Sequence, residues 1–181
     1  MEVTRFPGMR QDIPKHAMRK YFFFIAVLVL LLDRIAKWGV ASNIALHDSV
    51  VVIPGFFRLT HVQNTGAAFG LFAESSAQWK VGALVSFSVL ALVVVSALLW
   101  KNSHALSITT IGLSLILGGA MGNLWDRMFT GHVVDFLDFY VGSYHWPAFN
   151  VADSAIVVGA ILLVSEIVFA KSANETVKSN S

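Results

Sequence analysis

The sequence contains four stretches that are long enough and apolar enough to cross a lipid bilayer, at residues 21 to about 40, 81–100, 105–125 and 150–170. A helix rises about 1.5 Å per residue, and about 20 apolar residues therefore span the roughly 30 Å hydrocarbon core. Charged residues make up 13% of the chain, against about 25% in soluble domains. This composition argues against a soluble globular protein and excludes a disordered chain, and we expect an all-α membrane protein with four transmembrane helices.

The Lys and Arg residues predict the orientation, because cytoplasmic loops carry an excess of positive charge. With residues 1–20 in the cytoplasm, four spans return the C-terminus to the same side. Eight of the 13 Lys and Arg then lie inside: Arg5, Arg10, Lys15, Arg19, Lys20, Lys101, Lys171 and Lys178. We therefore expect a basic cytoplasmic segment at 1–20, a membrane domain at 21–170 and a cytoplasmic tail at 171–181. A cleaved signal peptide is the alternative for the first stretch, although no clear A-x-A site follows it.

Two segments are expected on the outer side, at about 41–80 and 126–149. In the first, residues 49–53 and 56–62 are β-prone runs on either side of Pro54-Gly55, and they predict a small strand pair. Asn64-Thr65-Gly66 predicts a turn. The inner loop at 101–104 is very short, so the second and third spans are expected to form an antiparallel pair.

Asp135 and Asp153 are the candidates for acid–base chemistry, because both are expected near the outer leaflet. Two close carboxyl groups do not both ionise, so one keeps its proton while the other stays charged. The charged one takes a proton from water, and the protonated one donates a hydrogen bond to a carbonyl oxygen, which hydrolyses a peptide bond without a metal. The alternative pairs Asp153 with Arg127 and leaves Asp135 as a solvated loop acid.

Other catalytic schemes lack their residues. The chain has no Cys, which excludes a thiol nucleophile and Cys-based metal sites. It contains neither HExxH nor GxSxG. Lys37 and Lys80 are the Lys residues near the outer side, and neither has a convincing Ser beside it for a Ser–Lys pair. We therefore expect no metal and no cofactor, and the net charge of +2 is too small to indicate a nucleic-acid partner.

Several motifs resemble, in the same order, those of the lipoprotein signal peptidases, or signal peptidase II. Asp33 stands four residues before Lys37 in the first span. The other motifs are NTGAAF at 64–69, GGAMGNLWDR at 118–127, GHVVDF at 131–136 and FNVADS at 149–154. The resemblance covers about residues 21–170 and includes the same four spans.

This resemblance implies a bacterial inner-membrane aspartic endopeptidase with its active site near the periplasmic face and both termini in the cytoplasm. Such enzymes remove the signal peptide from diacylglyceryl-modified prolipoproteins, cutting on the N-terminal side of the lipid-bearing cysteine. The family's catalytic pair falls on Asp135 and Asp153. Its substrate-binding or inhibitor-binding residues fall on Asn64, Asn123, Arg127 and Asn150, and Asp33 and Asp126 match supporting polar positions. Membrane lipid and the inhibitor globomycin are the other expected partners, and we expect a monomer.

Two other functions fit parts of the sequence. A proton-coupled transporter would use Asp33, Asp153 and Glu166 as a relay, although the centre of the membrane then has no carrier. A non-catalytic scaffold would bind partners through the GxxxG pattern at 118–122. We expect this pattern to serve packing within the chain instead.

Overall fold

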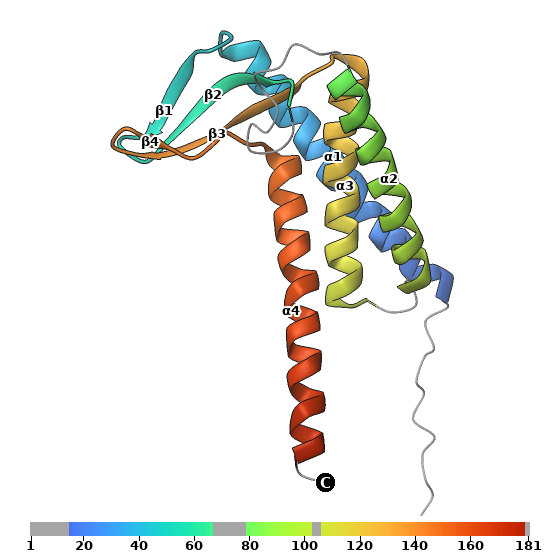
Figure 1. The fold of residues 1–181 in the computed structure, drawn as a ribbon. Helices are drawn as coiled ribbons and strands as arrows, with labels where there is room; N and C mark the ends of the chain where they lie inside the picture. Colours follow the sequence, from blue (N-terminus) through green and yellow to red (C-terminus); the bar gives the residue numbers. More distant parts are fainter. Residues whose placement is uncertain (1–14, 67–78, 103–105, 180–181) are drawn as a thin grey trace, which may run out of the picture.

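The computed structural model describes residues 15–66, 79–102 and 106–179, which form four helices and four strands (Figure 1). In chain order the elements are α1 Lys15–Asn43, β1 Ser49–Ile53, β2 Phe57–Asn64, α2 Trp79–Asn102, α3 Ile108–Phe129, β3 Val133–Val141, β4 Tyr144–His145 and α4 Val151–Ser179. The strands gather at one end of the helix bundle and project to one side of it. The inner loop expected at 101–104 lies partly outside the described residues.

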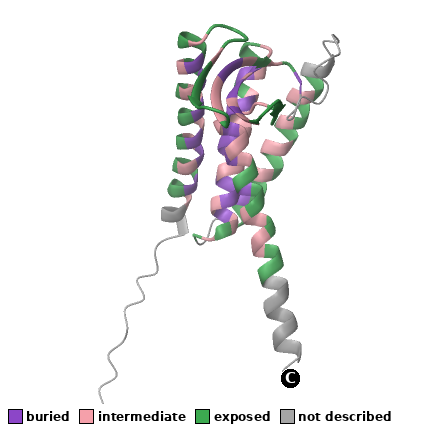
Figure 2. Cartoon of the chain, turned by 90° about the vertical axis from the view of Figure 1, so that its left-hand side faces the viewer, coloured by how far each residue is buried: buried purple, intermediate pink, exposed green. Residues whose placement is uncertain are grey.

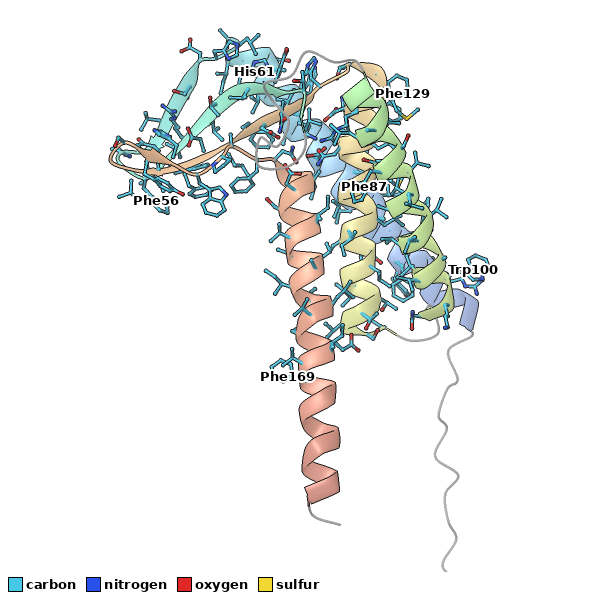
Figure 3. All side chains as sticks on the ribbon, viewed as in Figure 1. Phe56, His61, Phe87, Trp100, Phe129 and Phe169 are labelled. Carbon is cyan, nitrogen blue, oxygen red and sulfur yellow. The ribbon has the colours of Figure 1, made fainter. Side chains whose placement is uncertain are left out.

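Helix α3 is the centre of the bundle and contacts each of the other three helices. Buried residues gather along the axis of the bundle, whereas the outward faces are exposed (Figure 2). These outward faces are strongly apolar, and Trp100 and Phe169 point away from the bundle (Figure 3). A contiguous apolar surface of this kind fits contact with lipid.

Three helical segments in the described part of the chain are long and apolar enough to cross a membrane: Gly82–Asn102, Ile108–Phe129 and Val151–Phe169. They correspond to three of the four predicted spans. Helix α1 is not among them, because it carries Asp33, Arg34 and Lys37 in addition to basic residues in its first turns. The prediction of four spans is therefore supported in part.

Glycines allow α3 to pack closely against its neighbours. A Cβ atom at Gly118 would lie 2.5 Å from the carbonyl oxygen of Ala26 in α1, and one at Gly119 would lie 2.3 Å from that of Ala152 in α4. Both distances are far below van der Waals contact. The GxxxG pattern thus packs within the chain, as the sequence predicted, and brings α1 and α4 onto neighbouring faces of α3, where both approach Gly122.

The start and end of α3 differ from the prediction of 105–125. Ser107 is the N-cap and its hydroxyl accepts a hydrogen bond from the backbone N–H of Thr110, so the helix begins at Ile108. It continues to Phe129, which places Asp126 and Arg127 inside the helix rather than just beyond it. The prediction followed the apolar run and therefore ended the helix too early, because the last turn of this helix carries charged side chains.

The strands form one antiparallel sheet in the order β1-β2-β3-β4. The predicted strand pair is confirmed as β1 and β2. Strand β3 was not predicted, and it pairs with β2 so that Val62 lies opposite Asp135. Its buried positions include Asp135 and Asp138, so acids stand where a strand pattern usually shows apolar residues. The interpretation of Asp135 as a solvated loop acid is therefore wrong.

Candidate active site

Asp135 and Asp153 come from separate elements and line one cavity of about 130 Å³, together with Asn64, Phe149 and other residues. They are 18 positions apart in the sequence. The chain closes this gap by returning after β4 to place Phe149 beside β3, where its carbonyl oxygen accepts hydrogen bonds from the N–H groups of Phe136 and Leu137. Helix α4 begins two residues later, and its first turn therefore lies beside Asp135.

Asn150 joins the two acids directly. It is the N-cap of α4, because its Oδ1 accepts a 2.9 Å hydrogen bond from the backbone N–H of Asp153. Its Nδ2 donates to Oδ1 of Asp135 at 2.7 Å. The predicted capping role and a role at the site thus coexist in one fully buried side chain.

Asn64 holds the second oxygen of Asp135. Its Nδ2 donates to Oδ2 of Asp135 at 2.9 Å, while its Oδ1 accepts a 2.8 Å hydrogen bond from the backbone N–H of Gly66. The predicted turn after Asn64 is therefore present, and it orients the amide toward the acid. Both oxygens of Asp135 consequently accept hydrogen bonds from amide groups.

Burial raises the pKa of Asp135 from 3.8 to about 6, because only 3% of the residue is exposed and the charged form loses its hydration. The hydrogen bond from Asn64 opposes this rise, the nearby charge of Asp153 adds to it, and the hydrogen bond from Asn150 opposes it again. Near neutral pH this carboxyl group is thus able to hold or release a proton, as acid–base catalysis requires.

The carboxyl group of Asp153 accepts a hydrogen bond from a side chain of α3. Asn123 donates from Nδ2 to Oδ1 of Asp153 at 2.7 Å, and its own Oδ1 accepts a 3.0 Å hydrogen bond from Nζ of Lys37 in α1. Among the described residues no donor reaches Oδ2 of Asp153. Asp153 also lines a second cavity of about 300 Å³ between α2, α3 and α4, together with Asn123 and Arg127.

A buried cluster of charges stands behind Asn123. Lys37 lies 2.7 Å from Oδ2 of Asp33 and 2.7 Å from Oδ2 of Asp126, and Arg34 also pairs with Asp126. The other oxygen of Asp33 accepts the backbone N–H of Ala152 at 2.9 Å. The cluster therefore ties α1 and α3 to the first turn of α4, which carries Asp153.

Arg127 donates hydrogen bonds to the backbone, and the nearby acids, Asp153 first among them, act on it through their charge without a direct ion pair. Its guanidinium donates to the carbonyl oxygens of Asn123 at 3.3 Å and Gly66 at 3.2 Å. The ion pairs of the described part of the chain do not include one between Arg127 and Asp153, so that alternative is wrong. The residue links α3 to the turn after Asn64 and fixes one edge of the site.

The structure thus gathers six of the predicted site residues around the two cavities: Asn64, Asn123, Arg127, Asp135, Asn150 and Asp153. Asp33 and Asp126 line neither cavity, and both form ion pairs with Lys37, which contacts Asn123. The sequence prediction weighed Lys37 as a base for a serine and noted it four residues after Asp33 among the family motifs, but it gave Lys37 no role at the site. Its spacing of four residues from Asp33 was the available signal, because that spacing pairs charges on one helix face.

Glu166 takes no part in this site. It accepts a hydrogen bond from Thr109 of α3 and lines neither cavity, so the structure gives no support to the proposed proton relay. In the ranges that the structure describes, no cluster of three or more His, Asp and Glu side chains is arranged to hold a metal ion.

Replacing Asn64 with Ala is expected to move the titration of Asp135 to higher pH. The amide stabilises the charged carboxylate, so its removal raises the pKa of Asp135 further above about 6. Carboxyl ¹³C NMR of aspartate-labelled protein measures this, with Asp135→Asn used to assign the signal. Gln63→Ala changes the exposed neighbour on the same strand and should leave the titration in place. A shift to lower pH in Asn64→Ala would contradict this account of the hydrogen bond.

The fold and the site define a class, a membrane enzyme with a buried polar centre at one end of a helix bundle. A solved structure described as a bacterial membrane enzyme, determined by the in meso method at 2.3 Å resolution, superposes with a TM-score of 0.77 at 31% identity, covering 85% of this chain and 91% of that chain. A second one, determined at 1.9 Å resolution by the same method, superposes with a TM-score of 0.72 at 32% identity, covering 82% and 92% of the two chains.

The family follows from sequence comparison. The family model for signal peptidase (SPase) II matches residues 25–169. Lipoprotein signal peptidases from Solibacter usitatus and Desulforapulum autotrophicum are 46% and 44% identical to this chain. The first match covers 79% of this chain and 87% of the relative, and the second covers 81% and 91%. The chain belongs to the signal peptidase II family, whose members are peptidases.

Proposed function

We propose that this chain is an intramembrane aspartic endopeptidase that removes the signal peptide from diacylglyceryl-modified prolipoproteins, cutting on the N-terminal side of the lipid-modified cysteine. Membership of the signal peptidase II family supports the substrate class. The observation that carries the catalytic proposal is the cavity lined by both Asp135 and Asp153.

In the proposed mechanism, the two carboxyl groups share one proton and titrate as a unit. The ionised acid takes a proton from a water molecule in the cavity, and the resulting hydroxide attacks the scissile carbonyl carbon. The protonated acid donates a hydrogen bond to the carbonyl oxygen, and a proton then passes to the leaving amine. Two observations support this mechanism: no donor among the described residues reaches Oδ2 of Asp153, and burial raises the pKa of Asp135.

The surrounding polar residues are proposed to hold the substrate. Asn64, Asn123 and Asn150 orient the acids and offer donors and acceptors without adding charge. Arg127 already binds backbone carbonyl oxygens, and its guanidinium is suited to bind those of a substrate as well. The reaction is proposed to need no metal and no cofactor, and globomycin is proposed to occupy the same site.

We further propose that α1 is the fourth membrane span. Its charged residues Asp33 and Lys37 are buried against α3, whereas its other face exposes apolar side chains, of which Trp38 is 71% exposed. Charges paired inside a bundle do not face lipid. With α1 as a span, both termini lie in the cytoplasm. The chain is also proposed to be a monomer in the bacterial inner membrane, with its site facing the periplasmic boundary.

The proposed function is tested by incubating the purified protein with a diacylglyceryl-modified prolipoprotein and with the same precursor lacking the lipid. We expect cleavage of the lipidated form alone, at the bond before the modified cysteine, as measured by mass spectrometry of both products. Globomycin should stop the reaction and a metal chelator should not. Cleavage that ceases on chelation would refute the aspartic mechanism.

A further inference from the structure

A hydrogen-bonded path with one intervening side chain, the amide of Asn123, connects Lys37 to the proposed catalytic pair. We infer that Lys37 is a positioning residue for the reaction, which fixes the orientation of the Asn123 amide so that its NH₂ group faces Asp153. This inference rests on the proposed function, because it assigns a task in the same reaction. Lys37 itself lines neither of the two cavities at Asp153.

The chemistry of the donors decides the orientation. An ammonium group only donates hydrogen bonds, whereas a side-chain amide has one end that donates and one that accepts. Nζ of Lys37 lies 3.0 Å from the amide of Asn123 and therefore requires the oxygen on its side. The NH₂ group then faces Oδ1 of Asp153 at 2.7 Å. A reversed amide would place NH₂ against the ammonium and oxygen against the carboxylate.

Lys37 has no freedom to take another position. The residue is 2% exposed, and its ammonium group forms ion pairs with Asp33 and Asp126 and donates a hydrogen bond to Asn123. The two carboxylate oxygens of Asp33 and Asp126 that face it have no hydrogen-bond partner in the described part of the chain, so the ion pairs with Lys37 compensate for their burial. The two acids therefore hold the ammonium at the point where it selects the orientation of the amide.

The second amide at the site is oriented by a different donor. The backbone N–H of Asp153 fixes Oδ1 of Asn150, whose Nδ2 consequently faces Asp135. Nδ2 of Asn150 also approaches Oδ1 of Asn123 at 3.3 Å, a longer contact from a group that already donates to Asp135 at 2.7 Å. Lys37 is thus the nearer and the charged donor to Asn123.

Fixing the amide has a consequence for the reaction. The hydrogen bond to Oδ1 holds the Asp153 carboxyl group so that Oδ2 remains for water or substrate. Without it, the carboxyl group is free to rotate away from the geometry that attack requires. Because Lys37 does not line the cavities, its loss should lower kcat and leave KM nearly unchanged.

The test uses the full-length enzyme in bicelles and compares wild type with Asp33→Asn/Lys37→Met. This double variant removes one negative and one positive charge, and Asp126 loses its ion pair with Lys37 but keeps the one with Arg34, so no buried charge is left without any partner. We expect a folded protein with kcat lowered about 10- to 100-fold and KM within about threefold of wild type. Adding Asn123→Ala to this variant should lower kcat little further, because both changes remove the same hydrogen bond.

A folded double variant with wild-type kcat would overturn the inference. Such a result would mean that Lys37 only balances the charge of Asp33, because removing both charges together would then cost no activity. If the double variant does not fold, Asn123→Asp decides instead. It keeps Lys37 and places an oxygen where NH₂ faced Asp153, so a loss of kcat supports the inference and wild-type kcat overturns it. Asp153→Asn in the same assay separates the two proposals: its full activity would refute the proposed function itself.

Discussion

Replacing Asp153 with Asn is expected to reduce cleavage of a lipidated precursor by about a thousandfold or more, since general acid–base catalysis contributes about 10²–10⁴-fold. The amide has nearly the shape of the carboxyl group but does not ionise. Its oxygen is able to accept the hydrogen bond from Asn123, and the backbone N–H still binds Asn150. The fold should therefore persist while the proton transfer is lost.

Asp135→Asn is expected to have the same effect on cleavage, because the proposed mechanism needs both acids. The matched control is Asp48→Asn, which changes an exposed acid beyond the end of α1 and should retain wild-type turnover. Single-turnover cleavage of the lipidated precursor measures all three variants, with circular dichroism as the check on folding. Wild-type turnover in either Asp135→Asn or Asp153→Asn would show that the two acids do not form the catalytic pair.

Replacing Lys37 with Met is expected to lower the free energy of unfolding by about 3–5 kcal/mol, the usual result of leaving buried charges without their partner. Asp33 and Asp126 would each keep a buried oxygen that has lost its ion pair with Lys37 and that has no hydrogen-bond partner among the described residues. The same three groups join α1 to α3, so the packing of these two helices should weaken. Reversible unfolding in mixed micelles, followed by circular dichroism, measures the loss.

Lys101→Met is the control for this prediction, because Lys101 lies exposed in the last turn of α2. An exposed charge contributes little to stability, and this variant should unfold at nearly the same denaturant concentration as wild type. Adding Asp33→Asn to Lys37→Met should recover much of the lost stability, because the remaining charges are again balanced. Equal stability of Lys37→Met and wild type would mean that the cluster does not hold the helices together.

The elements that sequence predicted well depend on local composition. Uncharged runs located α2 and α3 to within a few residues, since a bilayer imposes a length on any apolar helix. The run 49–53, followed by Pro54-Gly55, located β1 and its turn to β2. The motifs at 118–127 and 149–154 pointed to the family that the comparisons show. Their residues gather at the site, and their catalytic role stays a prediction.

The elements that sequence missed depend on partners far along the chain. Strand β3 buries Asp135 and Asp138, and burial of an acid is favourable only when donors are supplied, here by Asn64 and Asn150 for Asp135. The end of α3 was placed too early for a similar reason, because Asp126 is tolerated there through its pairing with Arg34 and Lys37.

By itself, the sequence determined that the chain is a membrane protein, where its long helices lie and to which family it is similar, because hydropathy and local motifs are properties of neighbouring residues. Only the tertiary structure decided that Asp135 and Asp153 line one cavity and that Lys37 stands behind Asn123. Those facts depend on the return of the chain to β3 and on the close packing of α1 and α4 against the glycines of α3. Desolvation and charge pairing arise only once these distant segments meet.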